Sequence, residues 1–504
     1  MTVEMFYRII RGVYINEMKQ KSLKLNIVMN MFLTMSSFIF PLITFPYVSR
    51  ILSPEGIGKV SFATSLVAYF SMFSQLGIPT YGIRACAKVR DDKKELTKTA
   101  QELLIINLIM SAISYAAFCL MLLFVPRLQS EKRLYIIISF TIILTSIGME
   151  WLYKALEQYT YITIRSVLFK FIALIAMFLL IHKRSDYVLY GGISIFAASA
   201  SNVFNLINIH RYIDLKPVGG YNLKRHLKPI GIFFAMACAT TIYTNLDTIM
   251  LGFLTSDTDV GYYNAAVKIK NILVSVVTSL GTVLLPRASY YVENGLIDEF
   301  KRITKKALNF VFLLAVPLMV YFIFYAKEGI LFLSGSAYMG SIIPMQIIMP
   351  TLLFIGITNI LGIQILVPMG NEKIVLYSEI VGAMVDIIVN ALLIPRYASA
   401  GAALGTLIAE FTVLIVQFYT LKDEISNTFR QLHYIKILIA SFCGSFVSLW
   451  VKMLDMGCFF SLVISSILFC SAYVAVLLIL KEEMLLEIFD IMKNKVISIV
   501  TNNK

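Results

Sequence analysis

Charged residues are scarce in this sequence of 504 residues. They make up 15% of the chain, whereas soluble domains carry about a quarter; 58% of the residues are hydrophobic and the mean hydropathy is +0.79. The polar stretches between the apolar runs are too short to form a soluble domain. The scarcity of charge therefore excludes a soluble enzyme or binding module and predicts an all-α polytopic membrane protein.

Residues that bind metals or act as nucleophiles are also few. The four histidines are isolated, and the six cysteines lie mostly inside apolar runs without a CxxC or other ligand spacing. Free thiols in such runs are expected to be small buried hydrophobes. Because no acid, base and nucleophile stand in a catalytic pattern, the sequence predicts no metal, no cofactor and no enzymatic activity.

Apolar runs of roughly 20 residues, the length that crosses a hydrocarbon core, recur along the chain. Fourteen such spans are expected, with ends good to a few residues. They are 25–48, 60–80, 101–125, 134–152, 162–182, 188–209, 229–253, 262–285, 307–325, 341–368, 374–394, 400–420, 435–454 and 459–480.

Basic residues give the orientation of these spans. Of the 44 Lys and Arg, 31 lie on the side of the N-terminus, 10 lie on the other side, and Lys170, Lys268 and Lys270 lie within spans. The positive-inside rule therefore places both termini in the cytoplasm. The formal charge of +14 is a topology signal and does not indicate nucleic-acid binding. All outer connections are short, so the work of the protein must lie within the membrane.

An internal repeat divides the chain. At a shift of 203 residues, SPEGIGKVSFA at 53–63 falls on SDTDVGYYNAA at 256–266, and Arg84 falls on Arg287. A second match near a shift of 214 relates spans 4–6 to spans 10–12 and places Arg165 on Glu379. Parallel duplications of this kind are typical of alternating-access transporters, whose substrate site lies at the repeat interface.

The repeat predicts a division of the chain into lobes. A cytoplasmic amphipathic N-terminus, without the pattern of a cleavable signal peptide, precedes the first lobe, and two extra spans follow the second. The expected segments are 1–24 for this N-terminus, 25–211 for the N-lobe, 212–228 for a cytoplasmic linker, 229–421 for the C-lobe, 433–480 for spans 13 and 14, and 481–504 for a cytoplasmic tail.

Ionisable residues inside spans are costly and mark a pathway or a buried partner. Asp247 and Lys268 are expected at similar depth on neighbouring spans, either as a structural ion pair or as separate ion and substrate sites. Arg165 and Lys170 on span 5 correspond to acidic positions on span 11, so that one half is basic where the other is acidic. The cavity between the halves is thus predicted to hold an anion on one wall and a proton or cation on the other.

The order of motifs points to a family. FPYVSRILSPEGIG, YFSMFSQLGIPTYGIR, NLDTIMLG and DVGYYNAAVKI resemble Wzx-type flippases of O-antigen and related polysaccharides, in the multidrug/oligosaccharidyl-lipid/polysaccharide exporter superfamily. The resemblance implies two six-helix lobes and two extra helices. It also implies that the protein flips undecaprenyl-diphosphate-linked oligosaccharide across a bacterial inner membrane, coupled to H+ or Na+. Membrane lipids and polysaccharide polymerase or assembly proteins are the implied partners, and nucleic acid is not.

Two sets of candidate residues follow. Candidate substrate-binding cations are Lys170, Lys268, Lys270, Arg50 and Arg165, and candidate ion-coupling residues are Asp247, Asp386, Glu379 and Glu410. Two alternatives within the superfamily stay open: a cation-coupled multidrug antiporter and a lipid II flippase. Several cavity cations disfavour the antiporter.

Overall fold

The computed structural model describes residues 23–423, 425, 429, 431–454 and 456–487. All regular structure in this part of the chain is helical, which confirms the predicted all-α class. The predicted amphipathic helix within residues 1–24 and most of the predicted tail at 481–504 lie outside the described residues.

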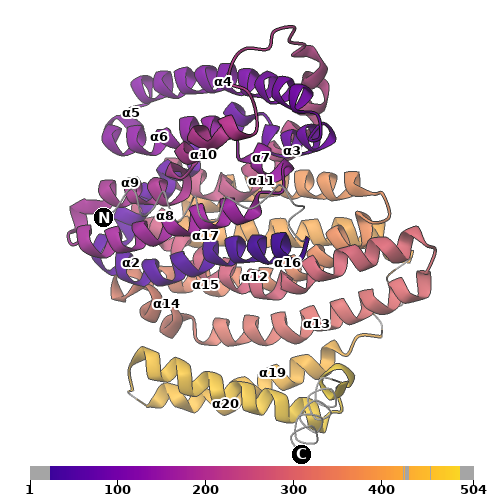
Figure 1. The fold of residues 1–504 in the computed structure, drawn as a ribbon. Coiled ribbons are helices and arrows are strands. Elements are labelled where there is room, and N and C mark those ends of the chain that lie inside the picture. The colour runs from indigo at the N-terminus through magenta and orange to yellow at the C-terminus, as the bar shows by residue number, and fades with distance from the viewer. Residues whose placement is uncertain (1–22, 424, 426–428, 430, 455, 488–504) are drawn as a thin grey trace, which may run out of the picture.

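Helices follow one another closely through the described part of the chain (Figure 1). The first half contains α2 (Leu23–Gln75), α3 (Ile78–Lys88), α4 (Lys93–Phe124), α5 (Pro126–Gln129), α6 (Lys132–Ile147), α7 (Glu150–Ala155), α8 (Tyr159–Leu180), α9 (Tyr187–Ile195), the π-helix η2 (Phe196–Ala200) and α10 (Asn202–Asn208). The second half contains α11 (Lys224–Leu254), α12 (Asp257–Glu293), α13 (Ile297–Phe324), α14 (Ala326–Ser334), α15 (Ile342–Ile348), α16 (Thr351–Thr358), the π-helix η5 (Asn359–Leu366), α17 (Glu372–Thr420), α19 (Tyr434–Leu449) and α20 (Gly457–Ile479).

Ten helices in the described residues are long and apolar enough to cross a membrane, or eleven if a bent pair is counted as one span. Two of the ten contain a break that divides them into two legs: α2 at Ser53 and α17 at Ala398. If each leg of α2 and α17 counts as one span, and the bent pair and the long helix α12 count as one each, the described helices are consistent with the fourteen predicted spans.

The first break lies in the SPEGIG turn. Ser53 has φ 61° and ψ 170°. A residue before proline is kept out of the α-helical region, which accounts for the end of the first leg but not for the positive φ. Pro54 then starts the second leg, where its missing N–H costs nothing. Its counterpart in the repeat is the start of α12, where Ser256 caps the helix by accepting a hydrogen bond from the Asp259 N–H. Two different local signals therefore produce the same sharp outer turn.

Two predicted spans are less regular than expected. The span predicted at 341–368 bends by 46° between residues 348 and 351 and continues into η5. Pro350 lies at the bend, and a proline removes a backbone donor from a helix. The span predicted at 188–209 is interrupted by η2, a single π-helical turn. Such turns occur frequently at functional sites.

Packing joins the two halves mainly at one end. A large buried cluster at the end predicted to face outward unites residues of both halves, such as Leu52 and Phe62 with Val260 and Ala402. At the opposite end the first half has its own cluster around Leu103, and the second half has another around Leu308. The halves therefore share one core at the end predicted to face outward and have separate cores at the other end.

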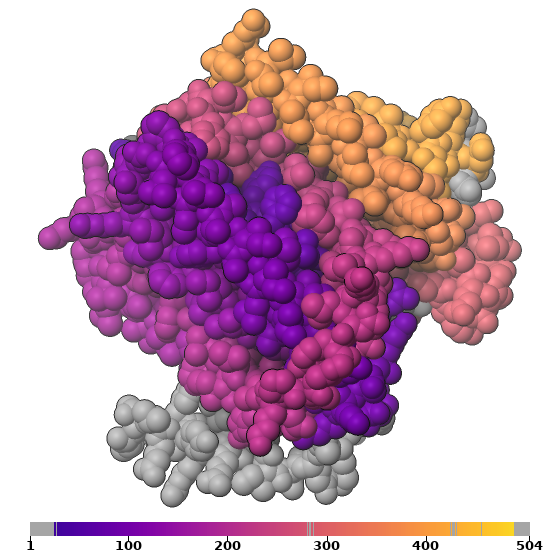
Figure 2. Space-filling view, turned by 90° about the horizontal axis from the view of Figure 1, so that it is seen from above, coloured from indigo at the N-terminus to yellow at the C-terminus, as the bar shows by residue number. Residues whose placement is uncertain are grey.

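The hairpin of α19 and α20 lies at the margin of the molecule, beyond α13 (Figures 1 and 2). Tyr321 on α13 donates a hydrogen bond to the Leu462 carbonyl, and Tyr473 on α20 donates one to the Leu313 carbonyl. The hairpin is thus an addition to the second half and does not separate the lobes.

The linker between the lobes is docked on the first half. Glu102 on α4 is fully buried; it accepts hydrogen bonds from the Asn222 N–H at 2.7 Å and from Arg225 at 2.8 Å, and His226 lies 2.7 Å away. Farther along α11, a β-carbon on Gly77 would lie 2.5 Å from the Phe233 backbone. The beginning of α11 therefore packs on the first half, although α11 ends within the second.

Candidate functional site

The two halves meet at the end predicted to face outward, in a contact that we call the outer closure. It is centred on Gly58 and Gly261, two glycines related by the repeat. A β-carbon on Gly58 would lie 1.6 Å from the Asp257 carbonyl oxygen, and one on Gly261 would lie 2.0 Å from the Pro54 carbonyl oxygen. The second leg of α2 and the start of α12 therefore cross in direct backbone contact. Only glycine fits at either position in this closed arrangement.

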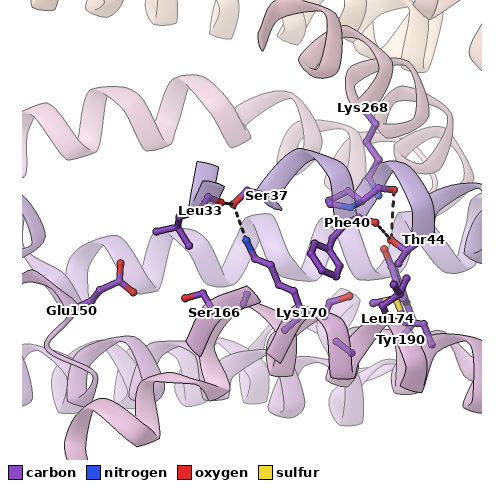
Figure 3. A pocket seen from close by; sticks show the side chains of 16 residues that line it. Leu33, Ser37, Phe40, Thr44, Glu150, Ser166, Lys170, Leu174, Tyr190 and Lys268 are labelled. Carbon is purple, nitrogen blue, oxygen red and sulfur yellow. Dashed lines mark hydrogen bonds between the residues drawn. The ribbon is translucent and has the colours of Figure 1, made fainter. Parts of the chain in front are cut away.

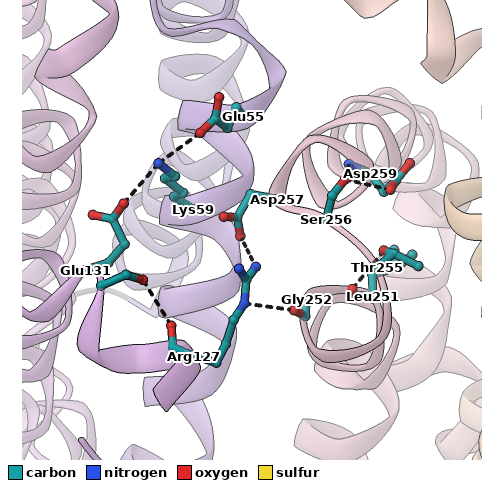
Figure 4. A network of polar contacts seen from close by, with 11 residues as sticks. Glu55, Lys59, Arg127, Glu131, Leu251, Gly252, Thr255, Ser256, Asp257 and Asp259 are labelled. Atoms are coloured by element: carbon teal, nitrogen blue, oxygen red, sulfur yellow. Dashed lines mark hydrogen bonds and ion pairs between the residues drawn. The ribbon is translucent and has the colours of Figure 1, made fainter. Parts of the chain in front are cut away.

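Polar contacts surround this crossing (Figure 4). Arg127 of the first half forms a salt bridge of 2.6 Å with Asp257 and donates to the Gly252 carbonyl at 3.2 Å. Next to it, Lys59 bridges Glu55 at 3.0 Å and Glu131 at 2.9 Å. The two halves are thus held together at their outer ends by charge as well as by packing.

Arg50 belongs to this outer closure, so its prediction as a cavity cation is wrong. Its guanidinium donates to the carbonyl of Pro46 one turn earlier and to the carbonyl of Phe332 on α14. The side chain is exposed and does not line the cavity described next. Arg50 therefore links the first leg of α2 to the second half.

A cavity of about 520 Å³ lies beneath the closure and contains two of the predicted cations (Figure 3). Lys170 reaches it from α8 and Lys268 from α12, so the cavity is lined by both halves. The Lys170 Nζ donates to Ser36 Oγ at 2.8 Å and to Ser37 Oγ at 2.9 Å. The Lys268 Nζ lies 3.9 Å from the centre of the Phe45 ring. We call this space the cationic cavity.

The irregular first leg of α2 shapes this cavity. Pro41 lies inside the helix and lines the cavity together with Ser37. Because Pro41 has no N–H, the Ser37 carbonyl four residues earlier lacks its usual helical donor. Pro41 therefore leaves a backbone carbonyl free beside the Ser36 and Ser37 hydroxyls, and these polar groups lie opposite Lys170.

Arg165 does not line the cavity, contrary to its prediction as a substrate-binding residue. It is buried and bonds Glu150 at 3.1 Å and the Ser201 carbonyl at 3.1 Å. Glu150 does line the cavity and is also paired with Lys154 at 2.9 Å. Arg165 and Lys154 therefore offset the charge of Glu150, the one carboxylate among the described residues that line the cavity. Arg165 therefore holds Glu150 in position. It pairs with Glu150 instead of standing opposite Glu379 as the sequence predicted.

Acidic and amide side chains form a separate cluster in the second half. Asn390 donates to Asp247 Oδ1 at 2.6 Å and to Asp386 Oδ1 at 3.0 Å. Thr406 donates to Asp247 Oδ2 at 2.8 Å, and Tyr263 donates to the same oxygen. All five side chains are buried. We call these residues the acidic cluster.

Glycine also permits the close approach within this cluster. A β-carbon on Gly405 would lie 2.1 Å from Asn390 Oδ1. The two legs of α17 can therefore pack tightly, and they bring Asp386 and Asn390 of the first leg against Thr406 of the second.

The remaining predicted charges surround the acidic cluster. Lys270 interacts electrostatically with Glu410 and Asp247, so it belongs here rather than to the cationic cavity. Glu410 is buried. Glu379 is half-buried and interacts electrostatically with Glu410. Of the two alternatives for Asp247 and Lys268, the structure places them apart rather than as an ion pair. Lys268 stands five positions after Tyr263 on α12, so the tyrosine faces Asp247 while the lysine faces the cationic cavity.

Sequence reasoning missed several of these residues. Glu150 sits near the end of a predicted span and has a charged partner fifteen residues later; such a pair is a usable signal for a buried ion pair. Asn390 stands four residues after Asp386, on the same helix face. Uncharged partners such as Ser36 and Thr406 give no signal in the sequence, because hydroxyls are common in every helix.

The family model described as polysaccharide biosynthesis protein matches residues 23–292, and a second model, MatE, matches residues 232–392. The chain belongs to the polysaccharide biosynthesis protein family. The resemblance inferred from the motifs is thereby confirmed, and relatives named as transporters agree with the prediction that the chain is not an enzyme.

Relatives and solved structures extend this result. The protein named "Putative O-antigen transporter" from Escherichia coli K12 is 25% identical over 398 residues, covering 78% of this chain and 95% of the relative. A protein of the same name from Shigella dysenteriae is 26% identical over 413 residues, with 79% and 98% covered. The structure of the lipid II flippase MurJ in an inward closed conformation has a TM-score of 0.70 and 17% identity, covering 89% of this chain and 98% of MurJ. The fold is therefore that of MurJ.

Proposed function

We propose that this member of the polysaccharide biosynthesis protein family flips undecaprenyl-diphosphate-linked oligosaccharide from the cytoplasmic to the outer leaflet of the bacterial inner membrane. It works by alternating access and is coupled to a proton or sodium gradient. The observation that carries the proposal is the cationic cavity, where Lys170 of one half and Lys268 of the other share a space inside the membrane. The membrane relatives named as O-antigen transporters support it.

The chemistry of the cavity fits a diphosphate. A diphosphate carries about two negative charges, and fixed ammonium groups in a polar cavity can compensate them without a covalent step. In the described part of the chain, Lys170 contacts only hydroxyls and Lys268 an aromatic ring. Both ammonium groups therefore remain available to an anion.

An apolar groove continues from this cavity toward lipid. It has a volume of about 240 Å³ and lies between α2 and α12, lined by Phe38, Leu42 and Ile272 among others. Ser37, Pro41 and Lys268 line both spaces. A polyprenyl tail in this groove places its diphosphate at Lys268.

The acidic cluster supplies the coupling site. Asp247 and Asp386 offer carboxylate oxygens, and Thr406, Tyr263 and Asn390 offer further oxygens around them. Such a set suits a proton or a small hard cation. Lys270 lies beside Glu410 and Asp247. A cation bound in the cluster would repel the positive charge of Lys270.

Lipid II transport is a second candidate because the fold is that of MurJ and the lipid carrier chemistry would be the same. The multidrug antiporter fits less well, since the two free lysines of the cavity would repel cationic compounds. A cell depleted of its own lipid II flippase distinguishes the candidates: rescue of growth by this chain would favour lipid II.

The test of the proposal uses a strain that depends on this chain for surface polysaccharide. Lys170→Gln and Lys268→Gln are expected to reduce polysaccharide at least tenfold while membrane levels of the protein stay normal. Lys373→Gln is the matched control, because Lys373 is exposed at the start of α17. Full polysaccharide in the Lys170→Gln and Lys268→Gln double variant would refute the proposal.

A further inference from the structure

A second cavity lies next to the cationic cavity and has different chemistry. Its volume is about 400 Å³, within the range of small-molecule sites, and it is lined by the second leg of α2, by α6 and by α11. No charged side chain lines it. Its polar groups are hydroxyls and amides, including Ser71, Gln75, Thr141, Thr145 and Asn245. We call it the neutral cavity.

Two of these hydroxyls lack a partner. Ser71 is 8% exposed, and its Oγ has no hydrogen bond; the Thr141 Oγ1 is also buried without one. A buried hydroxyl without a partner is costly, and native proteins rarely leave one unsatisfied. Both residues line the neutral cavity. The wall of the neutral cavity therefore contains hydroxyl groups with unused hydrogen-bonding capacity.

The π-helix η2 stands between the two cavities. Ala198 lines both, while Ala197 lines the cationic cavity and Ile195 the neutral one. The wall at this point consists of small side chains on a turn with irregular hydrogen bonding. The two cavities are therefore adjacent at Ala198.

From these features we infer that the neutral cavity is a sugar subsite, which binds the first sugars of the lipid-linked oligosaccharide and sets which sugar the protein accepts. This rests on the proposed function. Sugars carry many hydroxyls and weakly polar C–H faces, which match a wall of hydroxyls, amides and aliphatic side chains. With the diphosphate at Lys170 and Lys268, the attached sugar is adjacent to Ala198 and continues into the neutral cavity.

Binding of defined lipids to the purified chain in detergent, followed by native mass spectrometry, tests the subsite. The probes are undecaprenyl diphosphate without sugar, and the same lipid bearing N-acetylglucosamine, glucose or galactose. The wild type is expected to bind at least one sugar-bearing lipid more tightly than the sugar-free lipid. Thr141→Val and Gln75→Leu are each expected to remove roughly three- to tenfold of that advantage, the usual weight of a hydrogen bond, and to leave the sugar-free affinity unchanged.

Two further variants make the reading specific. Ala198→Leu alters no hydrogen-bonding group but adds bulk where the two cavities meet, and it is expected to weaken only the sugar-bearing lipids. Lys170→Gln is expected to weaken all four probes equally. The matched control is Thr412→Val, since the Thr412 hydroxyl bonds only its own helix, at the Ile408 carbonyl.

Each outcome decides between the proposals. If no sugar increases wild-type affinity, or if the advantage survives in Thr141→Val, Gln75→Leu and Ala198→Leu, the sugar subsite is wrong while the flippase proposal stands. If the wild type binds none of the four lipids, the proposed function itself is overturned, and the subsite with it.

Discussion

Gly58 and Gly261 meet the backbone of each other's repeat in a reciprocal way. Gly58 lies against the Asp257 carbonyl, and Gly261 lies against the Pro54 carbonyl. Because Asp257 is the counterpart of Pro54 at the same shift of 203 residues that relates the glycines, the contact has the symmetry of an isologous interface. The pseudo-two-fold axis of the duplication therefore passes through the outer closure.

Alanine at either glycine is expected to prevent outer closure. A methyl group would overlap a backbone carbonyl at 1.6 or 2.0 Å, so Gly58→Ala and Gly261→Ala should each lower surface polysaccharide at least tenfold, and to a similar degree. Gly231→Ala is the control, because nothing lies within 4 Å of a β-carbon there. Normal polysaccharide in Gly58→Ala would contradict a closed backbone crossing in the transport cycle.

The acidic cluster is expected to bind the coupling ion. For the purified wild type, exchange of choline for sodium at constant ionic strength, or a change from pH 8 to pH 6, should raise the thermal unfolding temperature by ligand linkage. Asp247→Asn and Asp386→Asn should abolish the rise and stop transport. Glu379→Gln, outside the hydrogen-bonded cluster, should keep the rise. A rise of unchanged size in both aspartate variants would exclude the cluster as the ion site.

The Glu150–Arg165 pair predicts a stability effect rather than a binding effect. Arg165→Met leaves Glu150 with Lys154 alone. Because the Glu150 side chain is 35% exposed, the expected cost is that of a hydrogen bond to a charged group, roughly 1.5–3 kcal/mol. We expect the unfolding temperature and the membrane level to fall together. The double variant Glu150→Gln with Arg165→Met should recover most of the loss. If Arg165→Met instead left stability intact and abolished transport, Arg165 would be a substrate residue after all.

Docking of the linker predicts protection from protease. Glu102→Ala removes the acceptor that holds Asn222, Arg225 and His226. Trypsin should then cleave at Lys216 or Lys224 severalfold faster, as followed by gel electrophoresis of inverted membrane vesicles. Asp91→Asn is the control, because Asp91 is exposed in the loop before α4. Unchanged cleavage of Glu102→Ala would show that the linker is held by other contacts.

The fold was largely accessible from the sequence because hydrophobic length and repeated turns are local signals. The match of SPEGIG with SDTDVG exposed the duplication that the Gly58–Gly261 contact displays in three dimensions. Helix irregularities were less accessible: Pro350 bends a span, as its chemistry suggests, but the π-turn at 196–200 has no proline and no evident sequence mark.

The site was only half accessible. Intramembrane charge drew attention to Lys170, Lys268, Asp247 and Asp386, since burying an unneeded charge is costly. The structure places the lysines in the cationic cavity and the aspartates in the acidic cluster, and their roles in transport stay predictions. Depth alone could not pair them, because two residues at one level can face opposite sides of a helix. Lys268 and Lys270, two positions apart on α12, therefore serve different sites.

The course of α11 has a mechanical consequence. Its first turns are fastened to the first half at His226 and Phe233, and its last turns carry Asp247 in the acidic cluster of the second half. If the halves rock against each other, α11 must bend between these two regions. There the Thr240 and Thr244 hydroxyls donate hydrogen bonds to backbone carbonyls of the preceding turn, a contact that loosens and bends helices. We therefore expect the occupancy of Asp247 and the angle between the lobes to depend on each other through the bending of α11.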